Sequence, residues 1–287
     1  MEGIVIRGLG GLYEVLRDGR VYECRGRGGL KRDRNILYVG DRVEFDQGAI
    51  GKILPRRNVL PRPPVANLDK LFIVVALSDP LPNLYTLDKL IVISEHCGIE
   101  PVLVLNKTDL EDPLSVREIY SSVGYPSFSV CAKTGENVDL LRDLMRGRTC
   151  AFAGLSGVGK STLMNALAPN FVRQTGEISR KLQRGKHTTR AVELYPFEGG
   201  FLADTPGFSE LEFSPCGLHD RSLLADYFPE FEPYSDDCFF RDCAHGKEKG
   251  CAVRAAVEEG RISRSRYENY LRMYEEIGPL RPWETTK

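Results

Sequence analysis

Hydrophobic and polar residues alternate in short runs along residues 1–60, and these runs show no helical period. They are GIVIRG, LYEVLRDGRVYEC, ILYVGDRVEF and GAIGKILP. Asp18-Gly19 lies inside the second run, and this dipeptide suits a type I′ hairpin turn, whose two central residues need a positive φ. Short strands at this spacing predict a small β-barrel.

A Pro-rich stretch, LPRPPVANLDK, separates this region from one with a different pattern. The runs that follow are apolar at successive positions and are separated by helical stretches. They are LFIVVAL, PVLVLN, SFSVCA, CAFAGL and GFLADT. Strands that are apolar on both faces and alternate with helices indicate a doubly wound α/β sheet.

The pattern changes again from about residue 209. Near the end, Ser263 and Gly278 are suited to cap a helix. Its apolar positions fall at helical spacing, and such a stripe is more often core packing than a base-stacking surface: Tyr267, Tyr270, Leu271, Tyr274 and Ile277. The basic residues off this stripe are expected to face solvent or RNA: Arg261, Arg264, Arg266 and Arg272.

Three domains are therefore expected: a barrel at 1–63, an α/β domain at 64–212 and a mostly helical domain at 213–287. The 287 residues are 42% hydrophobic and 28% charged, with a net charge of -1. A chain of this size can bury a core without disulfides. Because it has neither a run of about 18 apolar residues nor an apolar N-terminal leader, we expect a cytoplasmic protein without membrane contact.

The N-terminal region carries an excess of positive charge. Residues 1–64 hold 13 Lys and Arg against 8 Asp and Glu. A Gly-rich segment, CRGRGGLKRDRN, concentrates it in five candidate RNA contacts: Arg25, Arg27, Lys31, Arg32 and Arg34. Such a loop can follow a phosphate backbone, although a modest excess is also compatible with a solvated basic face.

A phosphate-binding motif follows the apolar run CAFAGL and precedes a helical stretch. It matches G-x-x-x-x-G-K-[ST], and the expected GTP-binding residues are Gly154, Leu155, Ser156, Gly157, Val158, Gly159, Lys160, Ser161 and Thr162. Glycines let successive N–H groups face the phosphates, and Lys160 supplies a positive charge to the β- and γ-phosphates. The Ser161 hydroxyl suits Mg²⁺.

The tetrapeptide DTPG ends another apolar run, so Asp204 should lie at the carboxyl edge of the sheet beside the phosphate loop. There it can hold Mg²⁺ through water, while the Gly207 N–H reaches the γ-phosphate.

Base recognition is assigned to NKTD and to SVCAK, each of which follows a strand. Guanine offers two adjacent donors that one carboxylate, Asp109, can accept, whereas adenine has no such pair. Asn106 serves the other edge of the base, Lys107 covers its face, and the Ala132 N–H is placed for the guanine oxygen. GTP is therefore expected over ATP, and the competing P-loop kinase or ATPase hypothesis predicts no guanine preference.

The order of these motifs is unusual because base recognition precedes the phosphate loop. A circular permutation explains this order at little physical cost, since domain termini often lie close together.

The segment RQTGEISRKLQRGKHTTR, residues 173–190, is long and polar, which favours a functional role. Either Thr188 or Thr189 is expected to close on Mg²⁺ and the γ-phosphate. Phe208 follows DTPG and cannot orient water, so unaided hydrolysis should be slow. His187 is the nearby side chain suited to assist catalysis, although an exposed loop histidine is an equal alternative on sequence alone.

A cluster of metal-ligand residues lies near the C-terminus: Cys238, Cys243, His245 and Cys251. Three sulfurs and one nitrogen make a closed tetrahedral set for one structural Zn²⁺. A disulfide would leave one cysteine over and would not use His245, and the scattered distribution of the other cysteines fits a reducing compartment.

Together the barrel, NKTD, GLSGVGKST, GKHTT, DTPGF and the Cys/His cluster resemble the RsgA family, also called YjeQ or YloQ. Its members are circularly permuted bacterial GTPases that assist maturation of the small ribosomal subunit. The resemblance covers nearly the whole chain. It implies an OB-fold barrel, rRNA contact, hydrolysis stimulated by the small subunit, zinc at the four ligands above and a catalytic role for His187. Cys131 departs from the serine or small residue often found in the guanine loop.

The resulting hypothesis is a monomeric GTPase that cycles between GTP and GDP with Mg²⁺ and assists late maturation of the small ribosomal subunit. Hydrolysis would release it from the subunit. The alternative is an RNA-binding adaptor in which GTP is a static regulatory ligand.

Overall fold

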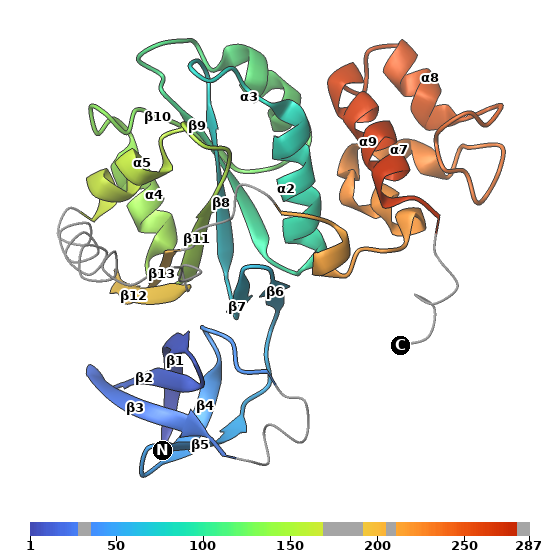
Figure 1. The fold of residues 1–287 in the computed structure, drawn as a ribbon. Helices are drawn as coiled ribbons and strands as arrows, with labels where there is room; N and C mark the ends of the chain where they lie inside the picture. The colour runs from blue at the N-terminus through green and yellow to red at the C-terminus, as the bar shows by residue number, and fades with distance from the viewer. Residues whose placement is uncertain (28–35, 169–191, 205–210, 280–287) are drawn as a thin grey trace.

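The N-terminal region is a closed barrel of five strands, as predicted (Figure 1). In the computed structural model, which describes residues 1–27, 36–168, 192–204 and 211–279, these are β1 (Glu2–Leu9), β2 (Leu12–Arg17), β3 (Arg20–Gly26), β4 (Arg42–Asp46) and β5 (Ala49–Ile53). The barrel closes because β1 pairs with both β2 and β4, while β5 pairs with β3 and β4. Asp18 and Gly19 have φ of 47° and 74°, which the predicted hairpin turn requires.

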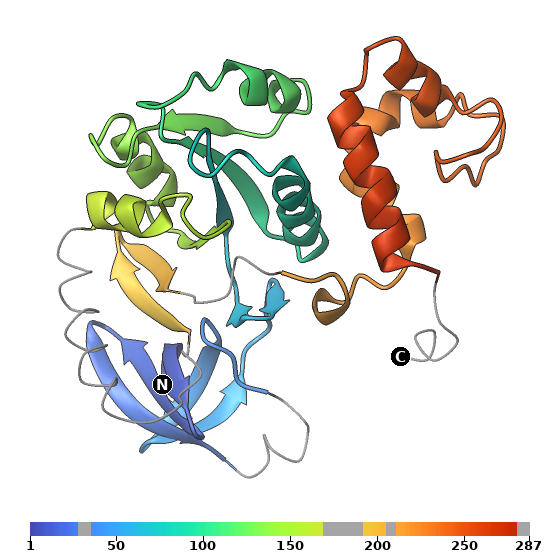
Figure 2. The ribbon, with the colours of Figure 1, turned by 45° about the horizontal axis from the view of Figure 1, so that its top comes forward.

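The central region is the predicted doubly wound α/β domain (Figures 1 and 2). Its strands lie in the order β10 (Ser127–Val130), β9 (Glu100–Asn106), β8 (Lys70–Ala76), β11 (Thr149–Ala153), β13 (Gly200–Asp204) and β12 (Glu193–Phe197). All are parallel except β12, which pairs antiparallel with β13.

Helices cover both faces of this sheet. One face packs against α2 (Leu84–His96) and α3 (Leu114–Ser121), and the other against α4 (Val138–Met145) and α5 (Lys160–Leu167). Alternate residues of β8 enter the two cores, Ile73 on the α2 side and Phe72 on the α4 side. Burial on both sides explains why the strand is apolar at every position.

The barrel joins the α/β domain in two ways. β1 pairs with β12 at Arg7 and Glu193, so that the barrel and the central sheet form one hydrogen-bonded sheet. A hairpin of β6 (Val59–Pro61) and β7 (Pro64–Ala66) lies between them in the chain.

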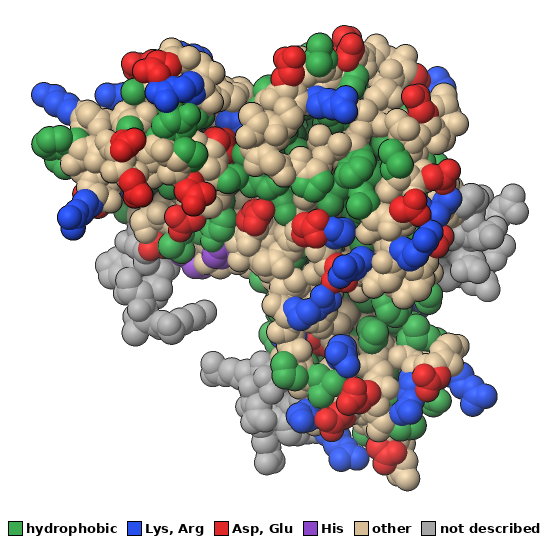
Figure 3. Space-filling view, turned by 180° about the vertical axis from the view of Figure 1, so that it is seen from behind, with side chains coloured by type: hydrophobic (Ala, Val, Ile, Leu, Met, Phe, Trp, Pro, Cys, Tyr) green, Lys and Arg blue, Asp and Glu red, His purple; other side chains and the backbone are tan. Residues whose placement is uncertain are grey.

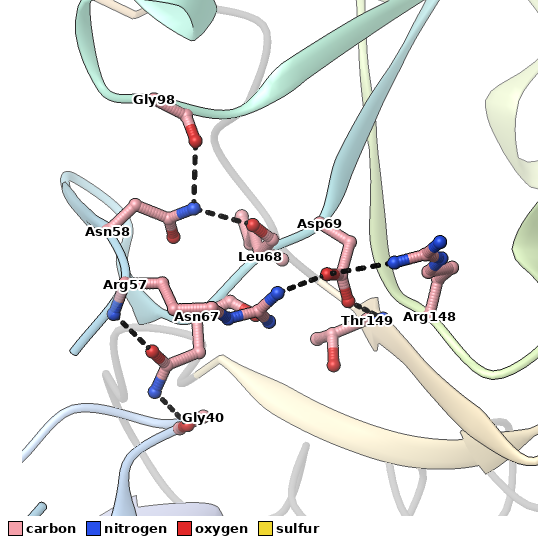
Figure 4. Close-up of polar contacts among 9 residues, drawn as sticks. All are labelled: Gly40, Arg57, Asn58, Asn67, Leu68, Asp69, Gly98, Arg148 and Thr149. Atoms are coloured by element: carbon pink, nitrogen blue, oxygen red, sulfur yellow. Dashed lines mark hydrogen bonds and ion pairs between the residues drawn. The ribbon is translucent and has the colours of Figure 1, made fainter. Parts of the chain in front are cut away.

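Polar contacts fix the linker beside this hairpin (Figure 4). The Asn67 amide donates to the Gly40 carbonyl of the barrel at 2.9 Å and accepts from the Arg57 N–H at 2.8 Å. Asn58 donates to the carbonyls of Leu68 at 2.7 Å and Gly98 at 2.9 Å.

The C-terminal region is mostly helical. It contains the short helices η1 (Ser214–Cys216), η2 (Arg221–Tyr227), η3 (Pro229–Phe231) and α7 (Glu232–Ser235), then α8 (Ala252–Glu258) and α9 (Arg264–Ile277). Ser263 and Gly278 stand at the predicted N-cap and C-cap positions of α9, although the Ser263 side chain makes no capping hydrogen bond. The tyrosine stripe of α9 packs into the core. The α9 helix lies beside α2 of the central domain (Figure 1).

One expectation for α9 is wrong. Arg266, predicted to face solvent or RNA, is 1% exposed. Its guanidinium lies between Asp88 of α2, at 2.6 Å, and Glu230 of η3, also at 2.6 Å. Sequence spacing put Arg266 off the tyrosine stripe, but this flank of α9 faces α2 instead of water. Among the described residues no helix is long and apolar enough to cross a membrane.

Candidate nucleotide site and metal centre

The phosphate loop connects β11 to α5 and is shaped by glycines. Gly154, Gly157 and Gly159 have φ of 136°, 81° and 97°. A Cβ on Gly154 would stand 2.3 Å from the Val74 carbonyl oxygen, so only glycine fits this close approach. The loop leads into the N-terminus of α5, where backbone N–H groups are available to an anion.

Lys160 is folded onto the loop. Its Nζ donates to the carbonyls of Gly154 at 2.6 Å and Leu155 at 2.7 Å. Burial lowers the pKa of Lys160. A phosphate anion would therefore offer this ammonium a stronger partner than two neutral carbonyls do. Ser161 and Thr162 follow on the first turn of α5 and are exposed.

Asn106 connects the base-recognition segment to the phosphate loop. It is 2% exposed at the end of β9. Its Nδ2 donates to the Val158 carbonyl at 2.9 Å, and its Oδ1 accepts from the Ala132 N–H at 3.0 Å. Asn106, which is expected to contact one edge of the base, thus also fixes the position of the phosphate loop relative to the SVCAK segment.

Asp109 faces two groups of the SVCAK segment. Its Oδ1 accepts from the Cys131 thiol at 3.3 Å, and its Oδ2 lies 3.5 Å from the Lys133 ammonium. The hydrogen bond from Cys131 lowers the pKa of Asp109, helped by Lys133, so the acceptor form is favoured. The sequence did not predict this role of Cys131, because its contact with Asp109 depends on the pairing of β9 with β10. Lys107 donates to the Asp79 carbonyl.

These motifs meet at one edge of the sheet. Asn106, Ala153 and Asp204 are the last residues of β9, β11 and β13. These three strands run parallel in one sheet, so their carboxyl ends lie at the same edge. The carboxyl ends of such strands are where open α/β sheets bind ligands. The other residues expected here lie outside the described residues: His187, Thr188, Thr189 and Gly207, as do Lys31, Arg32 and Arg34 of the basic segment.

The predicted metal ligands gather into one cluster. The donor atoms of Cys238, Cys243, His245 and Cys251 all lie within 4.8 Å of one another. His245 Nδ1 is 3.7 Å from the Cys238 sulfur and 3.6 Å from the Cys251 sulfur. All eight cysteines are free of disulfides. Three sulfurs around one imidazole nitrogen match the donor set of a structural Zn²⁺ site.

The surrounding residues hold this cluster in shape. The Tyr267 hydroxyl donates to the His245 carbonyl at 2.7 Å, and the Tyr270 hydroxyl donates to the Ala244 carbonyl at 2.8 Å. The Glu248 carboxylate accepts from the Ala244 N–H at 3.2 Å and from the Gly246 N–H at 2.8 Å. Burial lowers the pKa of His245, which favours the neutral imidazole that binds metals.

A barrel, a permuted α/β domain with its nucleotide motifs at one sheet edge and a Cys₃His cluster define a circularly permuted GTPase. Comparison with known proteins agrees with this class. The family model for the RsgA GTPase matches residues 53–214, and that for the RsgA N-terminal domain matches residues 2–51. The chain belongs to the RsgA GTPase family and is a GTP hydrolase.

Relatives and solved structures are similar along nearly the whole chain. "Small ribosomal subunit biogenesis GTPase RsgA" of Moorella thermoacetica is 44% identical over 96% of this chain and 97% of its own, and the protein of that name from Geobacillus kaustophilus is 44% identical over 98% and 99%. The crystal structure of YjeQ from Thermotoga maritima gives a TM-score of 0.82 at 36% identity, covering 96% of this chain and 98% of that one. YloQ, described as a circularly permuted GTPase, gives 0.78 at 34%, covering 96% and 94%.

Proposed function

We propose that this GTPase binds the small ribosomal subunit and assists its late maturation, that the subunit stimulates GTP hydrolysis, and that hydrolysis releases the protein. The observation that carries the proposal is 44% identity along nearly the whole chain to proteins named for this role. It acts as a monomer in the cytoplasm, and its units are 1–63, 64–212 and 213–287.

The nucleotide residues have these proposed roles. The loop from Gly154 to Thr162 holds the phosphates with Lys160, and Gly207 contacts the γ-phosphate. Asn106, Lys107, Asp109 and Ala132 recognise guanine. Ser161, Asp204 and one of Thr188 and Thr189 hold Mg²⁺, which supplies charge neutralisation at the phosphates. His187 assists hydrolysis.

The remaining contacts complete the proposal. One structural Zn²⁺ is bound by Cys238, Cys243, His245 and Cys251, and it stabilises the C-terminal fold. The RNA contacts include Arg25, Arg27 and Arg264, which are exposed. Lys31, Arg32 and Arg34 extend the same basic segment.

The test is GTP hydrolysis titrated with purified small and large ribosomal subunits separately. Stimulation by the small subunit alone is expected, and Lys160→Ala should abolish GTP binding or turnover. Absence of stimulation would favour the adaptor with GTP as a static ligand. Equal competition by ATP would contradict the guanine assignment, and normal turnover in the Lys160 variant would contradict the phosphate-loop assignment.

A further inference from the structure

Two phenylalanine side chains of the C-terminal region face solvent. Phe239 is 79% exposed and Phe240 is 45% exposed. Their rings meet edge to face with centroids 4.9 Å apart. Other aromatic side chains of this region are buried in its core: Phe228, Phe231, Tyr267 and Tyr270. The exposed pair therefore adds little to the stability of the fold.

The backbone holds the exposed pair in a fixed position. The pair lies between Cys238 and Cys243, two of the clustered metal ligands. The Phe239 N–H donates to the Gly250 carbonyl at 3.0 Å, and the Cys243 N–H donates to the Phe240 carbonyl at 3.3 Å. A Cβ on Gly250 would come within 2.9 Å of the Phe239 Cβ, so the two limbs of the loop are in close contact. A surface ordered before binding loses little entropy when a ligand arrives.

Basic side chains lie close to the two phenylalanines in sequence. Arg241, Lys247 and Lys249 are exposed, and none of them forms an ion pair within the described part of the chain. Three exposed carboxylates, Asp236, Asp237 and Asp242, also lie beside the rings in sequence. Glu248 is instead turned to the backbone N–H groups of its own loop. At the left edge of Figure 3, the outer end of this region presents hydrophobic side chains between Lys and Arg side chains.

We propose that the aromatic tip, Phe239, Phe240 and Arg241, is a stacking site for an unpaired base of ribosomal RNA. This inference rests on the proposed function, because it takes the RNA from the small subunit. An aromatic face stacks on any exposed base, and the surrounding cations neutralise the adjoining phosphates. Paired RNA hides its base faces in the helix, so the partner is a single-stranded loop or bulge. An apolar protein pocket would accept the rings but would leave the three unpaired cations without partners.

The first test measures the Kd of the full-length, zinc-loaded protein for small subunits in the presence of a non-hydrolysable GTP analogue. The double variant Phe239→Ala/Phe240→Ala should bind about tenfold more weakly or worse. Its zinc content and its hydrolysis of GTP without subunits should be unchanged. Leu223→Ala is the matched control, since Leu223 is 41% exposed in the same region. An unchanged Kd in the double variant overturns the inference.

The second test detects stacking directly and does not depend on the alanine variant folding. Phe239→Trp is combined with Trp283→Phe, which removes the single tryptophan of the chain, so that fluorescence reports on position 239 alone. A short single-stranded oligoribonucleotide should quench this fluorescence saturably, and a duplex of the same length should quench it much less. Absence of quenching, or equal quenching by duplex, overturns the inference.

The two tests together separate the possible partners. Weaker subunit binding by the alanine variant without RNA quenching would assign the aromatic tip to a ribosomal protein and overturn the stacking proposal. If the wild-type protein does not bind small subunits, the proposed function fails, and the oligoribonucleotide titration still decides whether the aromatic tip stacks on RNA.

Discussion

Arg7 of β1 and Glu193 of β12 form an ion pair across the boundary between the barrel and the GTPase domain, with Nε and Oε1 2.7 Å apart. The two residues are also register partners in the sheet. Glu193 is in turn the register partner of Asp204, the proposed Mg²⁺ residue at the end of β13. Two strand pairings, β1 with β12 and β12 with β13, therefore separate the barrel from the nucleotide site, and the Arg7–Glu193 pair lies on this path.

Reversing the charge at this connection should weaken the response to the subunit. Arg7→Glu places a carboxylate beside Glu193 and also beside Glu14, the second partner of Arg7. For partly exposed charges this costs about 1 kcal/mol, or about a fivefold shift in the equilibrium that holds the barrel against the GTPase domain, and subunit-stimulated GTP hydrolysis should fall by up to that factor. Hydrolysis without subunits should not change. The double variant Arg7→Glu/Glu193→Arg should recover most of the stimulation, because it restores opposite charges.

The control for this prediction is Arg42→Glu, which disrupts the exposed pair between Arg42 and Glu2 within the barrel. It should leave stimulation intact. A double variant as impaired as Arg7→Glu alone would show that the ion pair is not the link.

The linker supplies a prediction for pH. Burial acts to raise the pKa of Asp69, but hydrogen bonds from the Arg57 guanidinium and the Thr149 N–H outweigh burial and lower it (Figure 4). A carboxyl whose pKa is lowered in the folded state stabilises that state above its unfolded pKa of about 3.9, and this contribution is lost as pH falls through the folded pKa.

Asp69→Asn should therefore destabilise the protein most near neutral pH and progressively less in acid. Urea unfolding at a series of pH values, followed for wild type and variant, measures the difference in unfolding free energy. Asp18→Asn, which changes a carboxylate whose side chain is 84% exposed, is the surface control. A constant difference for Asp69→Asn would contradict the role assigned to its charge.

Local patterns predicted much of this molecule because the relevant contacts are close in sequence. The apolar runs of β8 and β9 are buried on both faces, so their composition identifies them without any knowledge of their neighbours. The Asp18-Gly19 turn and the caps of α9 also depend on adjacent residues. The metal cluster lies within one short loop region, and the spacing of its ligands was sufficient to find it.

Contacts between distant segments could not be predicted in this way. The sequence around Arg266 predicts a solvent-facing side chain on a helix. Its partner Asp88 is 178 positions away, so no local pattern indicates that the two residues meet. The pairing of Arg7 with Glu193 likewise depends on how two domains meet, and each strand alone is an ordinary alternating one. Cys131 contacts Asp109 only because β9 and β10 are adjacent in the sheet.

The buried group around Arg266 should control attachment of the C-terminal region to α2. Asp88 is 0% exposed and also accepts from the Tyr120 hydroxyl at 2.8 Å and the Asn269 amide at 2.6 Å. Arg266→Met would leave the buried Asp88 and the partly buried Glu230 without their cation, and leaving a buried charge unpaired typically costs about 3–5 kcal/mol.

The expected result is release and earlier unfolding of the C-terminal region, measured by limited proteolysis and thermal unfolding, with GTP binding retained. Arg264→Met is the control, because Arg264 is exposed on the same helix. Wild-type resistance to protease in Arg266→Met would show that this buried group does not attach the two regions.

Metal removal should unfold the same region by a different route. Cys251 is the N-cap of α8, and its sulfur accepts from the Arg254 N–H at 3.4 Å, so loss of zinc removes support from both the ligand loop and the helix. Elemental analysis should find one zinc per wild-type chain and a clear loss in Cys251→Ser. Cys150→Ser, which changes a buried cysteine of β11 outside the cluster, should keep its zinc.

A chelator strong enough to strip the metal should lower small-subunit affinity and expose the C-terminal region to protease. GTP binding should persist, because the nucleotide site lies in the central domain. Retention of a protease-resistant C-terminal region after complete zinc removal would contradict a structural role for the metal.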